Sequence, residues 1–335
     1  MPTAESHSAL LLSRKEVEQV LSPEEVVGAV EAAYREMGLG TATVPPRIRI
    51  DMEQYKGNLL VMPAYLKGIG ALGTKLVTTY LENFKLNLPS VLGTIILHDP
   101  QNGLPIAIMD GTYVTAMRTG AAGAVAAKYL SREDSSNVTV IGTGVQGRSQ
   151  VIALDIIRKL KHIFAFDSDR KRCQDYVQEM QERVDADVIQ VDDVPQAVRQ
   201  SDIVITATSS FEPVLRGEWL NEGTHVTGIG SHSSDARELD ENVVKRASKI
   251  VLDTWDAKTV GDIAYPISRG IIKEQDIYSD IGTIIAGKKP GRTSAKEITV
   301  FKSVGTAALD SSTAFKAYRL AKEKGVGKLV DLWQV

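Results

Sequence analysis

The sequence predicts an α/β protein with two domains, a doubly wound parallel sheet and a separate α+β domain. From residue 137 to about 254, apolar β-rich runs alternate with helical segments, which requires parallel strands joined by right-handed crossovers. Residues 47–97 instead carry short β-rich runs separated by Gly, Pro and Asn, as in an antiparallel or mixed sheet. The chain has 335 residues and is 43% hydrophobic, which is enough for two cores. We expect one domain to comprise residues 1–120 with 307–335, and the other 121–306.

The first predicted helix begins at Ser22. This residue can cap the helix, Pro23 suits its first position, and Glu25 lies three residues after the cap. The apolar residues that follow repeat at helical spacing as far as Gly38 or Gly40. The Ala- and Gly-rich segment 112–130 predicts a closely packed helix that bridges the domains, and a last helix over 311–324 should pack on the first domain.

The second domain is predicted from six strand-like runs. Helical segments separate the first four runs: one ends at about residue 161, the next covers residues 170–184, and the third is short. The runs, in chain order, are NVTVIG, HIFAFD, DVIQV, DIVITAT, THVTGIG and KIVLDT.

Composition excludes several classes of protein. The formal net charge is −3 and the basic residues are spread among carboxylates, so we expect no nucleic-acid partner. We find neither a signal peptide nor an apolar run of the roughly 18 to 20 residues that span a bilayer, and therefore expect a soluble, cytoplasmic protein without a membrane partner. The single cysteine, Cys173, lies beside Lys171 and Arg172 on a helix that we expect to be solvated. It can build neither a disulfide framework nor a thiolate metal site.

The motif GTGVQG follows the strand NVTVI and opens a helix, the context of a Rossmann dinucleotide-binding turn. Gly142 allows the tight turn, Gly144 lets backbone amides approach a pyrophosphate, and Gly147 allows the helix to pack on the strand. Val145 and Gln146 complete the predicted phosphate-binding segment. A second match, GIGALG at residues 68–73, leads into a β-rich run and is predicted to be a loop.

Asp167 ends the next strand, twenty residues after Gly147. An acid there can accept hydrogen bonds from the adenosine ribose and repel a 2′-phosphate, which favours NAD(H). Arg170, Lys171 and Arg172 follow closely, so NADP(H) remains the alternative.

The first domain places four cations, Arg47, Arg49, Lys75 and Arg118, on otherwise apolar segments. Charges in such surroundings are costly unless they are paired or functional. They are candidates for binding a substrate carboxylate or carbonyl; membership of surface ion pairs is the alternative.

A family resemblance extends over nearly the whole chain. The segments PPRIRI, VMPA, GTKLV, PIAIMDGTYVTAMRTGAAGAVAAKYL, GTGVQG, EGTHVTGIGSHSSDARELD and TVFKSVG occur in the order and spacing of the ornithine cyclodeaminase/μ-crystallin family. The resemblance implies a homodimer built from the α+β domain, which also binds substrate, and a Rossmann domain that binds NAD(P)(H).

The resemblance also implies residue roles. Arg47, Lys75 and Arg118 match the basic residues that hold an amino-acid or imino-acid carboxylate, with Arg47 and Arg118 as its bidentate clamp. Lys75 is also the candidate to donate or relay a proton at the reacting nitrogen. Thr119, Thr208 and the segment from Lys302 through Ser303 to Gly305 match contacts to cofactor or substrate near the nicotinamide.

One departure from the family pattern bears on the reaction. Ornithine cyclodeaminases and archaeal-type alanine dehydrogenases carry an Asp where this chain has His232. His232 could act as the acid or base, or Asp235 could replace it; a solvated loop histidine is the alternative. The pattern favours NAD(P)H-dependent reduction of a cyclic ketimine such as Δ1-pyrroline-2-carboxylate or Δ1-piperideine-2-carboxylate. Alanine dehydrogenase, then ornithine cyclodeaminase, then a non-catalytic protein that binds a small ligand, are the alternatives.

Overall fold

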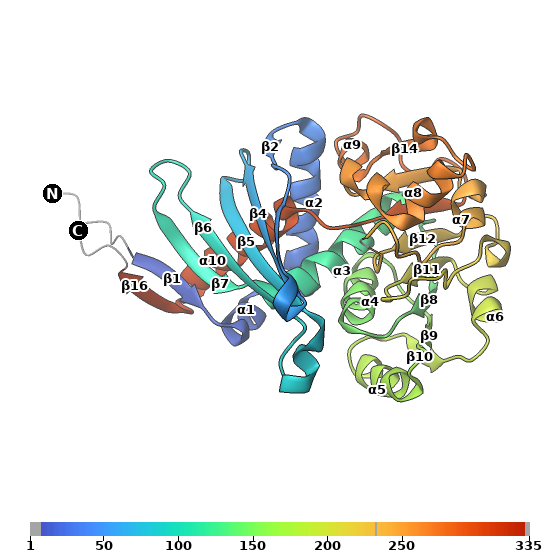
Figure 1. Ribbon diagram of the computed structural model, residues 1–335, viewed down its shortest axis with the longest axis horizontal. Coiled ribbons are helices and arrows are strands. Elements are labelled where there is room, and N and C mark those ends of the chain that lie inside the picture. Colours follow the sequence, from blue (N-terminus) through green and yellow to red (C-terminus); the bar gives the residue numbers. More distant parts are fainter. Residues whose placement is uncertain (1–7, 232, 332–335) are drawn as a thin grey trace. The chain divides into compact units, whose positions relative to one another are not determined.

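A computed structural model describes residues 8–231 and 233–331. The chain divides into two compact units, Met1–Arg118 with Thr306–Val335, and Thr119–Gly305. Figure 1 shows a mixed sheet with its helices in the first unit and a parallel sheet flanked by helices in the second. No helix within the described ranges is long and apolar enough to cross a membrane.

The first unit is built on an eight-stranded sheet of order β16-β1-β7-β6-β5-β4-β2, in which β3 also pairs with β4. All its pairs are antiparallel except β1 with β7, so the sheet is mixed. The strands are β1 (Ser8–Leu12), β2 (Ala42–Thr43), β3 (Ile48–Met52), β4 (Gly57–Leu66), β5 (Ala71–Tyr80), β6 (Val91–His98), β7 (Pro105–Asp110) and β16 (Lys328–Asp331). The helices are α1 (Arg14–Val20), α2 (Pro23–Leu39) and α10 (Ala307–Lys324), with α3 (Gly111–Leu130) crossing the division between the units.

The helix predicted after Ser22 is present as α2. The Ser22 hydroxyl accepts a hydrogen bond from the Glu25 amide at 3.3 Å, and Gly40 ends the helix in the left-handed conformation. Helix α10 begins at Ala307, four residues earlier than predicted, and packs on α2, β4, β5 and β6. The prediction that it returns to the first unit is therefore confirmed.

The mixed sheet has one covered and one bare face. Along β5 the odd-numbered residues from Ala71 to Val77, Lys75 among them, are buried, and a Cβ added at Gly73 would lie 2.9 Å from the Ser311 hydroxyl of α10. The opposite face carries rows of cross-strand neighbours, one of which joins Ile50 of β3 to Leu92 of β6. These two side chains are 50% and 41% exposed. The bare face is therefore apolar.

The second glycine motif has a structural role. Its first three residues lie in the turn between β4 and β5, where the buried Glu36 carboxylate accepts hydrogen bonds from the Gly68 and Ile69 amides, and its last three begin β5. A Cβ at Gly68 would lie 2.7 Å from a Glu36 oxygen, which explains the glycine.

The second unit holds eight parallel strands in the order β10-β9-β8-β11-β12-β15-β13-β14. The direction of winding reverses between β8 and β11, where dinucleotides bind in doubly wound sheets. The strands are β8 (Asn137–Ile141), β9 (His162–Phe166), β10 (Asp187–Gln190), β11 (Ile203–Thr206), β12 (His225–Gly228), β13 (Lys249–Leu252), β14 (Ile277–Asp280) and β15 (Thr299–Lys302). The helices are α4 (Val145–Ile157), α5 (Arg170–Gln181), α6 (Val194–Arg199), α7 (Glu241–Arg246), α8 (Gly261–Ser268) and α9 (Ile281–Ile285). The predicted fold class is confirmed.

The helix that carries Cys173 is solvated on one side only, and Cys173 lies on its buried side. Its side chain is fully buried on α5, and its thiol donates to the Ala165 carbonyl of β9 at 3.4 Å. The flanking Lys171 and Arg172 are exposed, because successive residues of a helix point in different directions. Neighbours in sequence were therefore a poor guide to this position.

Candidate functional site

A buried ionic cluster lies between the covered face of the mixed sheet and its helices. Lys75 on β5 and Arg118 on α3 both pair with Asp310 in the first turn of α10. The Lys75 Nζ lies 2.7 Å from Asp310 Oδ2, and the Arg118 Nε lies 2.7 Å from Oδ1. The three side chains are 2%, 6% and 1% exposed, so each charge depends on the others for stabilisation.

The cluster tunes the protonation of Lys75. Burial, opposed by the Asp310 carboxylate and reinforced by the nearby charges of Arg118 and Arg47, lowers the pKa of Lys75 to about 8. Burial alone would raise the pKa of Asp310, but the charges of Arg118 and Lys75 hold it below its ordinary value. The result is an ammonium able to release a proton near neutral pH beside a carboxylate that stays charged.

The structure thus brings together two of the predicted substrate residues, with Arg47 close enough to act on Lys75 electrostatically. Arg49, in contrast, is exposed and pairs with Asp51 at 2.8 Å, which is the surface ion pair weighed as its alternative. Asp310 was not among the predicted site residues. Its only signal was an acid within a run of small and apolar residues, AALDSSTA.

The glycines of GTGVQG divide into two kinds. Gly142 has φ of 100°, and a Cβ there would lie 2.5 Å from the Ala207 carbonyl oxygen. A Cβ at Gly147 would lie 2.2 Å from the Gly142 carbonyl oxygen, whereas one at Gly144 would meet nothing within 4 Å. The backbone therefore requires the first and third glycines, while the second borders open space at the start of α4, where Val145 is 65% exposed and Gln146 half-buried. These residues fit a dinucleotide pyrophosphate.

Asp167 follows β9 at the same edge of the sheet. One carboxylate oxygen accepts hydrogen bonds from the amide and hydroxyl of Thr143, both at 2.9 Å, and the other accepts from the Asp169 amide at 2.9 Å. Burial would raise the pKa of Asp167, but these hydrogen bonds and Arg172 outweigh it and hold the pKa below its ordinary value. The carboxylate is thus charged and fixed beside the glycine turn.

The remaining predicted cofactor residues lie elsewhere in the second unit. Thr208 follows β11 and donates to Glu238 through both its amide and its hydroxyl, at 2.6 and 2.8 Å. The Thr119 carbonyl accepts from Gln150 of α4 at 2.8 Å. Ser303 and Gly305 follow β15, and both donate to the buried Asp253, at 2.7 and 2.6 Å.

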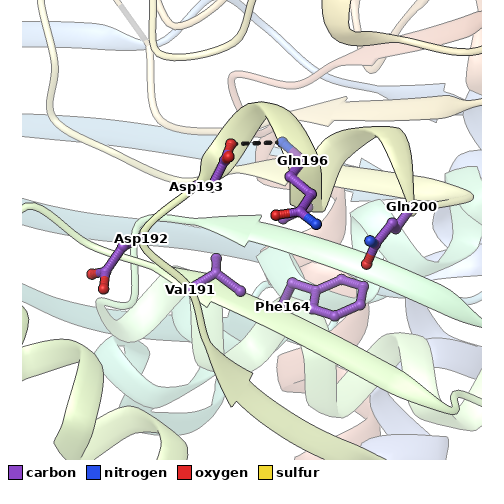
Figure 2. Close-up of a pocket in the computed structure, with 7 residues that line it drawn as sticks. Phe164, Val191, Asp192, Asp193, Gln196 and Gln200 are labelled. Carbon is purple, nitrogen blue, oxygen red and sulfur yellow. Dashed lines mark hydrogen bonds between the residues drawn. The ribbon is translucent and has the colours of Figure 1, made fainter.

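A surface pocket lies beside the middle of β9, the segment that follows β10, and α6 (Figure 2). Phe164 of β9 and Val191 supply apolar lining, and the Asp193 carboxylate accepts a hydrogen bond from the Gln196 amide at 2.9 Å. Asp192, Ala197 and Gln200 complete the lining. The pocket belongs to the β8–β9–β10 half of the sheet, the half whose strands lead into the glycine turn and Asp167.

The segment after β12 bears on the missing family Asp. His232 lies outside the described residues. Asp235 is exposed, and hydrogen bonds to its carboxylate, first from Ser233, hold its pKa below the ordinary value. Ser231, in the same loop, is buried, and its hydroxyl donates a hydrogen bond to the Ala236 carbonyl at 2.6 Å. In this conformation Asp235 is a solvated residue of the loop.

Comparison with known proteins extends the likeness to both units. An alanine dehydrogenase from Archaeoglobus fulgidus is 38% identical over 97% of this chain and 99% of its own length. The solved structure of Δ1-pyrroline-2-carboxylate reductase from Thermococcus litoralis, in complex with NADH and L-proline, is 43% identical, covering 96% of this chain and 100% of that one, with a TM-score of 0.92. An archaeal alanine dehydrogenase dimer with bound NAD is 39% identical, covering 97% of this chain and 100% of that one, with a TM-score of 0.91.

These relatives are oxidoreductases, and the two solved structures hold NADH or NAD, in agreement with the enzyme class and the favoured cofactor predicted from the sequence. Residues 7–325 match the ornithine cyclodeaminase/mu-crystallin family. The match covers most of the chain, and the full-length relatives support it independently. The chain therefore belongs to the ornithine cyclodeaminase/mu-crystallin family.

Proposed function

We propose that this protein reduces a cyclic 2-imino acid, Δ1-pyrroline-2-carboxylate or Δ1-piperideine-2-carboxylate, to the corresponding L-amino acid with NADH. The observation that carries the proposal is the buried cluster of Lys75, Arg118 and Asp310. It offers a guanidinium for a carboxylate and an ammonium with a pKa of about 8 for a proton. A preformed imine needs little else from the protein besides orientation.

In the proposed reaction Arg118 and Arg47 bind the substrate carboxylate and so orient the ring. Lys75 gives its proton to the imine nitrogen, and Asp310 retains its negative charge and holds Lys75 in place. The hydride for the imine carbon would come from NADH held by the second unit. Proton and hydride together saturate the C=N bond, and neutral Lys75 is reprotonated from solvent.

The dinucleotide would be held by the second unit. Gly144 leaves the backbone open to the pyrophosphate, and Asp167 presents a charged carboxylate to the adenosine ribose. That carboxylate would repel a 2′-phosphate, which favours NADH over NADPH. Thr119, Thr208, Ser303 and Gly305 are proposed as contacts near the nicotinamide.

Alanine dehydrogenase activity is the second candidate, because relatives of that name are 38% and 39% identical. This reaction must also add ammonia to pyruvate and expel water, which asks more of an acid/base group. With Asp235 exposed, only His232 would supply it in that loop.

We also propose a homodimer formed through the bare apolar face of the mixed sheet. Large exposed apolar faces commonly mark sites of association. An archaeal alanine dehydrogenase of the same fold is a dimer.

The test follows the near-ultraviolet absorbance of NADH and, separately, NADPH with purified protein and three substrates: Δ1-pyrroline-2-carboxylate, pyruvate with ammonia, or ornithine. Rapid oxidation of NADH with the cyclic imine, at least about tenfold faster than with pyruvate and ammonia, is expected. A signal with pyruvate and ammonia alone would contradict the reductase and favour alanine dehydrogenase. Arg49→Gln, which breaks only an exposed ion pair, is the control for Arg118→Gln, which should lose the activity.

A further inference from the structure

The buried carboxylate of Glu238 connects two strand ends in the second unit. It precedes α7, and it is fully buried. Its Oε1 accepts from the amide and hydroxyl of Thr208, at 2.6 and 2.8 Å, and its Oε2 accepts from the Thr206 hydroxyl at 2.9 Å and the Gly230 amide at 2.6 Å. Thr206 and Thr208 belong to the end of β11, and Gly230 follows β12. Burial raises the pKa of Glu238 above its ordinary value, against the charge of Lys302 and the hydrogen bonds from Thr208. The four donors, two of them backbone amides, are the complement of an ionised carboxylate.

This edge of the sheet carries an excess of buried negative charge. Asp262 accepts hydrogen bonds from the Glu238 and Leu239 amides at 2.7 and 2.9 Å, and pairs with Lys302 at 2.8 Å. Asp253, also buried, holds the segment after β15. Among the described residues, the buried ionisable side chains at this edge are three carboxylates, Glu238, Asp253 and Asp262, and the ammonium of Lys302.

The position of this charge relates to the proposed cofactor. In a doubly wound sheet the dinucleotide lies across the point where strand order reverses, here between β8 and β11. The glycine turn and Asp167 follow β8 and β9, so the adenosine half of the dinucleotide would lie over these two strands. The nicotinamide half would then lie over the ends of β11 and β12, which Glu238 connects. The nicotinamide ring is cationic in NAD⁺ and neutral in NADH. A fixed negative charge nearby therefore stabilises the oxidised form more than the reduced form.

We propose that Glu238 is a positioning residue of the nicotinamide half of the site, and that its charge makes the protein bind NAD⁺ more tightly relative to NADH. By this bias it promotes hydride donation. The inference rests on the proposed cofactor. The proposed role of Glu238 differs from a purely structural one, because a loss of structure would weaken the binding of NAD⁺ and of NADH alike.

The experiment measures the dissociation constants of NADH, by its fluorescence, and of NAD⁺, by competition, for the full-length protein and its variants. Glu238→Gln keeps the shape and removes the charge. We expect it to raise the ratio of the NAD⁺ to the NADH dissociation constant by about tenfold, the order expected when one buried unit charge is removed near another. Glu238→Asp keeps the charge but shortens the side chain, and should weaken both forms while restoring the ratio to within about twofold of the wild type.

Asp240→Asn is the matched control. Asp240 lies two residues away, and its carboxylate accepts backbone amides at the start of α7, so this variant should leave the ratio unchanged. If Glu238→Gln does not fold, Lys302→Met makes the opposite change in charge and should lower the ratio.

Equal weakening of both forms by Glu238→Gln, or no change in ratio with Lys302→Met, would overturn the proposal. A wild-type protein that binds neither form would instead refute the proposed cofactor, and the inference with it. Binding of both forms with an unaltered ratio in the variants would refute the inference alone.

Discussion

Lys75 and Asp310 make the chemistry of the candidate site depend on pH. A lysine whose folded-state pKa lies near 8 is protonated below that pH and neutral above it. In the proposed reduction, Lys75 must be protonated to give its proton to the imine nitrogen.

We therefore predict that kcat/KM for imine reduction is level below about pH 8 and falls about tenfold for each pH unit above it. Initial rates measured from pH 6 to 10 at constant ionic strength check this. An exposed lysine has a pKa of about 10.4, roughly two units above that of Lys75. A profile that stays level to pH 10 would therefore exclude Lys75 as the proton donor.

The Asp310→Asn variant tests the coupling directly. Without its carboxylate, Lys75 and Arg118 lose their common counter-charge, and the pKa of Lys75 should fall further because Asp310 raises it. We predict a loss of at least about tenfold in kcat and a shift of the alkaline limb to lower pH. Asp51→Asn, on an exposed pair of the same sheet, should leave both unchanged. A variant that loses kcat with no shift of the limb would argue against control of Lys75 by Asp310.

At the scale of elements, the motif that leads from β8 into α4 contains two glycines that serve different purposes, one for folding and one for binding. Close packing requires Gly147, where a Cβ would lie 2.2 Å from a carbonyl oxygen. At Gly144 the backbone conformation is an ordinary extended one, and a Cβ would have room. The motif thus combines a folding requirement with a binding requirement.

We predict that Gly144→Ala keeps the melting temperature within about 2 °C of the wild type but weakens NADH binding by about tenfold or more, because the methyl group occupies the space of the pyrophosphate. Gly147→Ala should lower the melting temperature by several degrees as well, through overpacking. Thermal unfolding and NADH fluorescence titration distinguish the two. Unaltered NADH affinity in Gly144→Ala would place the pyrophosphate elsewhere.

At the scale of the whole molecule, the bare face of the mixed sheet exposes apolar side chains to solvent when the chain is isolated. Ile48 and Ile50 of β3 are 58% and 50% exposed, and Leu92 of β6 is 41% exposed. A second copy of the chain on this face would bury them and contribute the apolar area that a stable interface needs.

We predict that the wild type is a dimer and that the double variant Ile50→Lys/Leu92→Lys is a folded monomer, because two charges would then be buried against the partner's apolar face. Light scattering coupled to size-exclusion chromatography gives the masses, and circular dichroism reports the fold. Ile156→Lys, at a 40% exposed position on α4, is the control and should remain dimeric. A double variant that stays dimeric would locate the interface elsewhere.

Local patterns sufficed to predict much of this protein. The capped helix after Ser22, the alternation of strands and helices, and the glycine turn before α4 are all encoded within short segments, because caps, periodicity and backbone freedom act over a few residues. The strand β1 was not predicted. Its five residues, SALLL, are too short to distinguish a strand from an apolar stretch, and β1 is specified by its pairing with β7 and β16.

The sequence by itself determined the fold class, the glycine turn and the identities of the candidate cations Lys75 and Arg118. Only the tertiary structure decided which carboxylate controls those cations: Asp310 lies 192 residues from Arg118, and no periodicity or motif spacing links them. It likewise decided that Cys173 is buried and that Glu238 joins β11 to β12. The physical reason is that burial and ion pairing depend on which distant segments pack together, whereas helix caps and turns depend on neighbours in the chain.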